Sequence, residues 1–336
     1  MSALTTSVVS VVVVCSVLVS SVGAVELAPG DLIVTDFNHG DLDGPGSVSK
    51  FDPITGVQTL ISTGVNLDNP MAVAIDGFGD IIVLDQPGTS GGPAELIRIN
   101  PADGTQQVIS SGGMVNPTGL SLDSAGNFLV SDAGLVWTGG TGGILEIDRT
   151  TGVQTVFSSG GFFLGANSLT IDAAGDIFAT TGNASNGLTV LKIDPVTGAQ
   201  TVVSTGTFQT AHSGIAVAAS GDIFVNELYY TNGTIKVDPI TGTQSWLSTG
   251  GYFQDPYGLD FDAAGDLIVA DSNWWWPGNI FKVNPTTGAQ TLIASGLVDP
   301  AGIVVYPIPE PSTFVLLAMG AFGLLAYAWR RRRHLS

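Results

Sequence analysis

Six side chains that could hold a metal ion recur in the sequence at intervals of 43 to 51 residues. They are Asn69, Asn116, Asn167, His212, Asp255 and Asp299. Each stands at or near the start of a short apolar segment, and proline follows four of them. Calcium takes roughly six to eight oxygen ligands, so a fold that gathered these side chains around one axis could bind calcium. The alternative is a set of structural turns, because Asn or Asp before proline commonly starts a turn.

Nucleophilic catalysis has little support in the sequence. The chain has one cysteine, Cys15, and three histidines, of which His39 and His212 lie in its central part. No Gly-x-Ser-x-Gly motif leads from a strand into a helix, as a serine hydrolase of the α/β class would require. We therefore predict no catalytic residue and no organic cofactor.

Aromatic residues cluster in the irregular segments between the repeats. Trp137, Tyr229, Tyr230, Trp274, Trp275 and Trp276 fall there, with Phe162-Phe163 and Tyr252-Phe253 in other segments. Three consecutive tryptophans cannot all be buried in a strand, whose faces alternate. We predict that the first six residues form a surface for a ligand or partner. In the alternative interpretation, they plug the mouth of a channel or cap a neighbouring unit.

The elements that would position these residues are repeats of one short unit. A Gly-Asp or Gly-Asn pair recurs six times, at Gly30, Gly79, Gly126, Gly175, Gly221 and Gly265, with steps of 44 to 49 residues. A short β-branched or aromatic run follows each pair, and an Asp-Pro or similar turn closed by glycine comes later, as in 51–56 and 193–198. Glutamine stands two residues after each turn glycine. Four short strands per unit, repeated at this period, are typical of a β-propeller.

The sequence therefore predicts an all-β, six-bladed propeller of four-stranded antiparallel blades over residues 25–306. The chain starts on the second strand of one blade and ends on the first strand, so we expect 301–306 to pair with 32–36 and close the ring. Short, uniform turns should lie on one face and the long aromatic loops on the other. The first strand of each blade should line the central channel.

The repeat pattern P-x-G-apolar, followed by D-x-x-G-D-apolar-apolar-V-x-D, resembles NHL-type repeats. These are similar to the SMP-30/gluconolactonase and streptogramin-lyase propellers. The resemblance implies a divalent ion held in the channel by Glu, Asn and Asp, and a metal-dependent lactonase or related hydrolase is the alternative function. This sequence places no glutamate at the start of a channel strand. A binding protein without catalytic activity is the leading hypothesis.

Both ends of the chain carry apolar segments outside the repeats. Residues 1–24 have the pattern of a signal peptide cleaved after Ala24 by signal peptidase, with an uncleaved anchor as the alternative. The other end has Pro309, Glu310 and Pro311, an apolar run at 313–329 that is long enough for a transmembrane helix, and the arginines Arg330, Arg331, Arg332 and Arg333. A plain membrane anchor would explain these features. The segment 307–336 also resembles the PEP-CTERM sorting tail of bacteria, which implies cleavage near 309–311 by an exosortase and release to the envelope or an exopolysaccharide matrix.

The chain is strongly acidic, with a formal net charge of −19. Residues 25–308 alone hold 28 acidic and 6 basic side chains. This balance disfavours nucleic acid and anionic lipid as partners. Five of the basic residues, Lys50, Arg98, Lys192, Lys236 and Lys282, share one position of the repeat, and Glu146 takes the sixth. We expect a repeated ion pair there.

These observations predict an exported protein at the cell envelope, the outer surface or the extracellular matrix, which meets the membrane only through its uncleaved C-terminal helix. The expected processing partners are signal peptidase and an exosortase. An exopolysaccharide or surface proteins are the candidate ligands, and we expect a monomer.

Overall fold

The computed structural model describes residues 25–37, 45–87, 91–134, 142–183, 187–206, 214–228, 231–273 and 277–307. These residues form 24 strands, and none of their structure is helical. Accordingly, the described ranges hold no helix that is long and apolar enough to cross a membrane. The predicted signal peptide 1–24 and the predicted transmembrane helix 313–329 lie outside these ranges.

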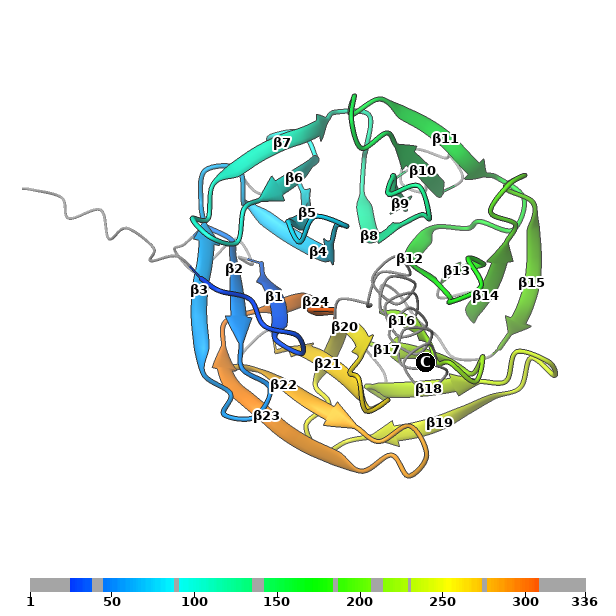
Figure 1. The fold of residues 1–336 in the computed structure, drawn as a ribbon. Helices are drawn as coiled ribbons and strands as arrows, with labels where there is room; N and C mark the ends of the chain where they lie inside the picture. The colour runs from blue at the N-terminus through cyan, green and yellow to red at the C-terminus, as the bar shows by residue number, and fades with distance from the viewer. Residues whose placement is uncertain are drawn as a thin grey trace, which may run out of the picture.

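The strands form six four-stranded antiparallel sheets arranged as blades around a central axis (Figure 1). Blade 1 comprises β24 (Pro300–Val305), β1 (Leu32–Asp36), β2 (Ser47–Phe51) and β3 (Gln58–Thr63); blade 2 comprises β4 (Asn69–Ile75), β5 (Ile81–Gln86), β6 (Glu95–Ile99) and β7 (Gln106–Ser111); blade 3 comprises β8 (Pro117–Leu122), β9 (Phe128–Asp132), β10 (Gly143–Ile147) and β11 (Gln154–Ser159). Blade 4 comprises β12 (Ala166–Ile171), β13 (Ile177–Asn183), β14 (Gly187–Ile193) and β15 (Gln200–Thr205); blade 5 comprises β16 (Ile215–Val217), β17 (Ile223–Glu227), β18 (Gly233–Val237) and β19 (Gln244–Thr249); blade 6 comprises β20 (Asp255–Phe261), β21 (Leu267–Ser272), β22 (Gly278–Val283) and β23 (Gln290–Leu297). The six-bladed all-β propeller predicted from the repeats is confirmed.

The ring is closed by the two ends of the folded chain. Strand β24 pairs antiparallel with β1, so that Leu32 lies opposite Val305 and Asp36 lies opposite Pro300. The backbone N–H of Tyr306 donates to the carbonyl of Asp31 at 2.7 Å. This is the predicted pairing of the last strand with the first, and it removes two open sheet edges.

The apolar core lies between neighbouring blades. Ile33 of β1 packs with Val73 and Ile81 of blade 2. Its neighbours Leu32 and Val34 point the other way and pack with Ile268 of blade 6. Because alternate residues of a strand face opposite sides, the second strand of each blade must be apolar on both faces. This explains the uninterrupted apolar runs after each Gly-Asp pair.

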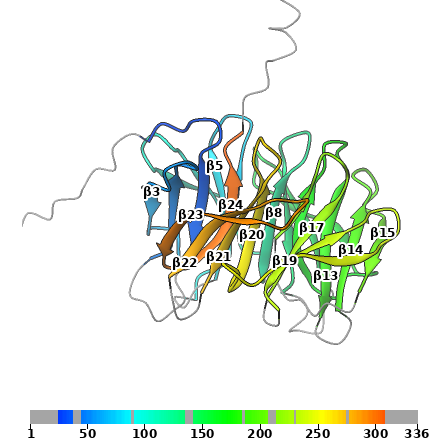
Figure 2. The ribbon, with the colours of Figure 1, turned by 90° about the horizontal axis from the view of Figure 1, so that it is seen from below.

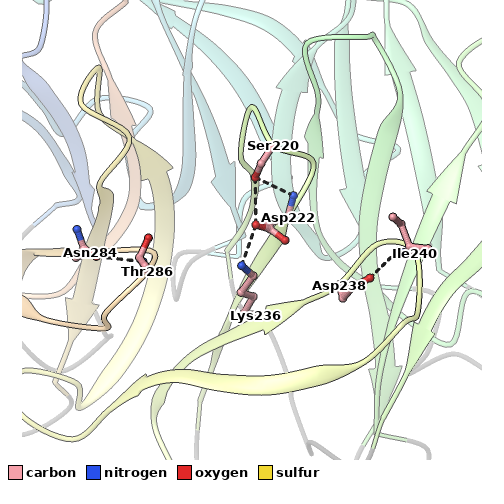
Figure 3. Close-up of polar contacts among 7 residues, drawn as sticks. All are labelled: Ser220, Asp222, Lys236, Asp238, Ile240, Asn284 and Thr286. Carbon is pink, nitrogen blue, oxygen red and sulfur yellow. Dashed lines mark hydrogen bonds and ion pairs between the residues drawn. The ribbon is translucent and has the colours of Figure 1, made fainter.

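The turn between the third and fourth strands repeats the same bonding. In blade 5 the carboxylate of Asp238 accepts a hydrogen bond from the backbone N–H of Ile240 at 2.8 Å (Figure 3). It accepts another from the backbone N–H of Thr241, also at 2.8 Å. Gly242 closes this turn with a φ of 69°. A Cβ on Gly242 would lie 2.7 Å from the carbonyl oxygen of Val203 in blade 4, so only glycine allows this approach.

The repeated basic residue forms a cross-strand ion pair within its blade, as the repeat predicted. Lys236 lies 2.8 Å from the carboxylate of Asp222 (Figure 3). Equivalent pairs join Lys50 to Asp31, Arg98 to Asp80 and Lys192 to Asp176. Arg98 also contacts Asp76, and Lys282 pairs with Asp262, which takes the repeat position of Asp76. In blade 3 both partners differ together, and the amide of Asn127 donates to Glu146 at 2.8 Å.

A second repeated contact joins each blade to the next, and we call it the interblade latch. It consists of a serine in a fourth strand, the turn glycine of the following blade and the glutamine two residues after that glycine. Ser62, Ser110, Ser158, Ser204 and Ser248 each donate to the glycine carbonyl at 2.6–2.8 Å. The glutamines Gln106, Gln154, Gln200, Gln244 and Gln290 donate back to these hydroxyls at 2.9–3.1 Å. The junction of blade 6 with blade 1 has Ala294 in place of the serine, and Gln58 bonds instead to Ser49 in its own blade.

Candidate functional site

The innermost strands enclose a central cavity of about 300 Å³. Five of these strands carry a β-bulge near their start, which leaves at least one residue unpaired in each. Met71, Thr118, Asn167, Tyr257 and Ala301 lie in these bulges, and all five line the cavity. A bulge can re-aim a side chain, and each of these five bulges brings at least one residue to the lining of the cavity.

One side of the cavity mouth, formed by blades 2 to 4, is lined by amide groups. The side-chain amide of Gln86 donates to Oδ1 of Asn116 at 3.0 Å and to the carbonyl of Pro117 at 2.7 Å.

 Nδ2 of Asn69 donates to Oε1 of the same Gln86 at 3.4 Å. A chain of three amides therefore follows this part of the rim.

Asn167 adds a fourth amide to this side of the cavity, outside the chain of three. Its residue is only 5 % exposed, yet among the described residues its Nδ2 has no hydrogen-bond partner. Oδ1 of Asn69 is likewise buried and without a partner in the described part of the chain. Both residues line the cavity. Buried polar atoms are normally satisfied, so two unsatisfied amide atoms at one cavity indicate capacity to bind a polar molecule.

The other side of the mouth, formed by blades 1 and 6, is aromatic. The rings of Phe37 and Tyr257 meet edge to face, with centroids 5.6 Å apart and an interplanar angle of 63°. Below them the cavity is lined by apolar side chains, including Leu120, Leu169 and Ile303. The site thus has an amide side, an aromatic side and an apolar floor.

The described lining of the cavity carries no formal charge, since none of its residues is Asp, Glu, Lys, Arg or His. The surrounding chain, by contrast, has a net charge of −19. The acidic residues that end the second strands lie behind the rim. The carboxylate of Asp85 accepts the backbone N–H groups of Asp68 at 3.0 Å and Asn69 at 2.9 Å. Asp132, Asp271 and Asp36 bind the equivalent positions of their blades.

These capping interactions show where the six predicted metal ligands lie. Asn69, Asn116 and Asn167 come together at the cavity, as expected for a rim. Asp255 and Asp299 are not part of its described lining; they lie where blade 6 meets blade 1, and the hydroxyl of Ser272 donates to Asp299. His212 lies outside the described residues. In the turns before the prolines, a carboxylate from the same blade accepts the backbone N–H of the residue that precedes each proline.

Burial raises the pKa of several of these carboxyls. Desolvation raises the pKa of Asp36 to about 6, that of Asp85 to about 7 and that of Asp271 to about 8, against backbone hydrogen bonds that lower each one. The pKa of Asp255 rises to about 6, because of desolvation and then the nearby charge of Asp299. The groups therefore titrate between mildly acidic and mildly alkaline pH.

The six aromatic residues predicted as a ligand surface, Trp137, Tyr229, Tyr230, Trp274, Trp275 and Trp276, lie outside the described residues. In each of the two aromatic pairs in the other loops, one ring is buried and the other is exposed. Phe163 and Phe253 are buried, and the ring of Phe253 meets Phe281 edge to face at 4.9 Å. Their neighbours Phe162 and Tyr252 are exposed.

Sequence reasoning missed Gln86 and Tyr257 as site residues. Gln86 directly follows the acidic residue that ends a second strand. The same position holds Phe37 in blade 1, Ala133 in blade 3 and Ser272 in blade 6. Variation at one position of an otherwise regular repeat is a signal that could have identified it.

Comparison with known protein families identifies the C-terminal segment. Residues 307–333 match the PEP-CTERM protein-sorting motif. The chain carries a PEP-CTERM sorting signal. Such a signal implies export and processing by an exosortase at the cell envelope, as the Pro-Glu-Pro triplet and the arginines predicted. The matched segment starts one residue after Tyr306, directly behind the strand that closes the propeller.

The folded part resembles several solved propellers. TolB from Acinetobacter baumannii has a TM-score of 0.64 and 14 % identity, covering 83 % of this chain and 67 % of that one. A protein of the nidogen/laminin complex gives 0.61 and 13 %, with 81 % and 97 % covered. The periplasmic gluconolactonase PpgL of Pseudomonas aeruginosa gives 0.57 and 16 %, with 82 % and 98 % covered. At these identities the similarity establishes the fold alone, and no curated protein matches the sequence.

The described residues do not fit the calcium site that the lactonase resemblance implies. Calcium sites combine several oxygen ligands and usually include carboxylates. The described lining supplies neutral amides and hydroxyls, and the described ranges hold no cluster of three His, Cys, Asp or Glu side chains suited to a metal. Asp299, which the sequence placed at the rim, is buried.

Proposed function

We propose that this PEP-CTERM protein is a binding protein without catalytic activity, which acts at the outer surface or in the extracellular matrix. Its ligand in this proposal is the exopolysaccharide or a surface protein of the producing cell. The observation that carries the proposal is the combination of a sorting signal with an uncharged, partly aromatic cavity at the axis. A channel mouth of this kind can hold a neutral ligand, and its described lining contains amides and hydroxyls but no carboxylate, imidazole or thiol.

The path of the closing strand supports an outward-facing binding site. Strand β24 starts at Pro300, beside the cavity mouth, and Tyr306 follows its end near Gly79, in a tight turn of the opposite face. Figure 2 shows β24 crossing the thickness of the disc. The sorting motif starts at residue 307. Any attachment through this tail therefore holds the tight-turn face toward the cell and leaves the cavity mouth facing outward.

The aromatic loops remain part of this proposal. Trp137, Tyr229, Tyr230 and Trp274–Trp276 fall in sequence between second and third strands, and we infer that they extend the binding surface of the cavity mouth. Replacing the three tryptophans by alanine should weaken binding at least tenfold while the melting temperature is kept. Ile240→Ala, at an exposed turn of the opposite face, is the matched control. A triple variant that loses stability in proportion to binding would mean that the tryptophans plug the fold instead.

The deciding experiment is a binding assay with the processed protein purified from producing cells. We expect saturable binding to the exopolysaccharide of the same cells, with no dependence on calcium. The competing hypothesis is a metal-dependent lactonase, and it predicts turnover of sugar lactones that chelation abolishes. Lactone turnover by the pure protein, with no binding to cell-surface material, would overturn the proposed function.

A further inference from the structure

We propose that the central cavity is a subsite for one uncharged, hydroxyl-rich ring, the size of a single neutral sugar residue. This inference rests on the proposed function, since it names the chemical class that the binding protein would recognise. Three features of the cavity support it. They are its volume, the unused hydrogen-bonding atoms of its amides, and the position of polar and aromatic side chains on opposite sides.

The size of the cavity limits the ligand. Ligand sites occupy roughly 300–1,000 Å³, and the volume of about 300 Å³ lies at the lower end of this range. Its lining includes apolar side chains of the inner strands, such as Leu120 and Leu169. A single ring can enter from the mouth, whereas the rest of a longer chain would lie outside on the loop face.

The amides match hydroxyl groups. A hydroxyl both donates and accepts, and so does an Asn or Gln side chain. Nδ2 of Asn167 offers an unused donor and Oδ1 of Asn69 an unused acceptor. The hydroxyl of Thr118, which donates to the carbonyl of Ala166 at 3.0 Å, retains acceptor capacity beside them. A ligand that brought hydroxyls to these atoms would give each of them a hydrogen-bond partner.

The aromatic side of the cavity and the lack of charge in its described lining further limit the class of ligand that it can bind. Phe37 and Tyr257 present apolar ring surface opposite the amides, and the C–H face of a sugar ring packs well on such a surface. An anionic sugar would enter a lining without a described cation, in a chain with a net charge of −19, and would be repelled. A cationic ligand would find no described carboxylate at the cavity to pair with.

Asn167→Leu is the most informative test, because it separates binding from folding. The substitution keeps a similar side-chain size and removes a buried amide whose Nδ2 is unsatisfied. We expect an unchanged or higher melting temperature together with at least about fivefold weaker binding, the loss of one hydrogen-bonding group. A merely structural asparagine would show a lower melting temperature instead. Gln107→Ala, an exposed amide on β7, is the matched control and should leave both quantities unchanged.

The measurement is titration of the full processed protein with glucose, galactose and N-acetylglucosamine, followed by ligand-observed NMR, with galacturonate and calcium chloride as the comparison probes. Binding of at least one neutral sugar, lost in Asn167→Leu and stronger than binding of galacturonate, supports the proposal. No binding of any neutral sugar at tens of millimolar, or equal binding by the variant, overturns it. Calcium binding that Asn167→Leu abolishes would also overturn it and would favour the metal site. If the exopolysaccharide still binds while the sugars do not, the proposed function stands and this subsite is rejected.

Discussion

The side-chain amide of Gln244 in blade 5 donates to the hydroxyl of Ser204 in blade 4 at 2.9 Å, and that hydroxyl donates in turn to the carbonyl of Gly242 at 2.6 Å. The same interblade latch occurs at five of the six junctions. At the sixth junction, where blade 6 meets blade 1, the turn glycine approaches the neighbouring strand as closely, but alanine replaces the serine and there is no hydroxyl. A Cβ on Gly56 would lie 3.6 Å from the Cβ of Ala294, and the equivalent distance from Gly104 to the Cβ of Ser62 is 3.7 Å.

Ala294→Ser should therefore complete the ring of latches. The new hydroxyl can donate to the carbonyl of Gly56 and accept from Gln58, which now bonds to Ser49 at 3.1 Å. We expect a gain of about 1 kcal/mol in the free energy of unfolding and a rise of a few degrees in melting temperature. Thermal unfolding followed by circular dichroism measures it. Ser204→Ala is the matched control and should lower the melting temperature; a destabilised Ala294→Ser variant would contradict the equivalence of the junctions.

The exchanged pair in blade 3 predicts a coupling between two positions. Asn127→Asp alone places a carboxylate against Glu146, which the Asn127 amide now contacts at 2.8 Å, and should destabilise the protein. Adding Glu146→Lys recreates the ion pair of the other blades and should restore stability. A double-mutant cycle on urea unfolding should give a coupling energy of up to about 1 kcal/mol. Additive effects of the two substitutions would argue against a shared contact.

The stability of the propeller should fall as the pH rises from mildly acidic to mildly alkaline values. The pKa values of Asp36, Asp85 and Asp271 lie at about 6, 7 and 8 in the folded chain, above the ordinary value of 3.8 for an aspartate. The folded state thus holds these protons more tightly than the unfolded state does, and this stabilisation is fully present below about pH 4 and is lost as the pH rises through 6 to 8. Turn carboxyls such as Asp238 have lowered pKa values and act in the opposite direction in acid.

We therefore expect a maximum of melting temperature near pH 5, measured from pH 3 to pH 9. Asp271→Asn keeps an acceptor for the backbone N–H groups of Gln254 and Asp255 and removes one titrating group. Its melting temperature should fall less between pH 6 and pH 8 than that of the unaltered protein. Asp238→Asn should change only the acid side. A melting temperature that rises from pH 5 to pH 8 would contradict the raised pKa values.

Processing should remove both apolar ends of the precursor. Mass spectrometry of the exported protein should show a start near Val25 and an end near Pro309–Pro311, because the sorting motif covers 307–333. Glu310→Ala should leave precursor in the membrane fraction, while Glu26→Ala, an acidic change near the other end, should not. Full-length chain with its four arginines in extracellular material would show that no cleavage takes place.

The fold could be predicted from the sequence because each blade repeats the same local chemistry. Asp238, Pro239 and Gly242 specify one turn wherever the pattern occurs, and the Gly-Asp pairs mark the following strand. The ring closure was predictable for a related reason, since the first and last strands are complementary parts of one repeat. Each of these signals depends only on neighbouring residues.

The site was only partly predictable because it depends on the direction of single side chains. Asn167 looks out of register in the sequence, because it stands two positions further along its repeat than Asn69 and Asn116 do in theirs. That shift puts it at the unpaired bulge position between Ala166 and Ser168, which points to the axis. Asp255 and Asp299 keep the register and lie outside the described lining of the cavity. Asn69 and Asn116 share the repeat position of Asp255 and Asp299, yet only the two asparagines line the cavity. Spacing in the sequence therefore does not show which of these four side chains reach the cavity.

The position of β24 determines how this protein responds to mechanical pulling. The strand that closes the ring continues directly into the tail, so tension on the tail enters the fold at Tyr306 and acts along the axis of β24. Its partner β1 lies antiparallel beside it from Leu32 to Asp36. Tension along the strands loads all the hydrogen bonds between them at once, as shear, and does not peel them apart one by one. A propeller held at its C-terminus against fluid drag would thus resist opening until the whole β1–β24 register gives way together.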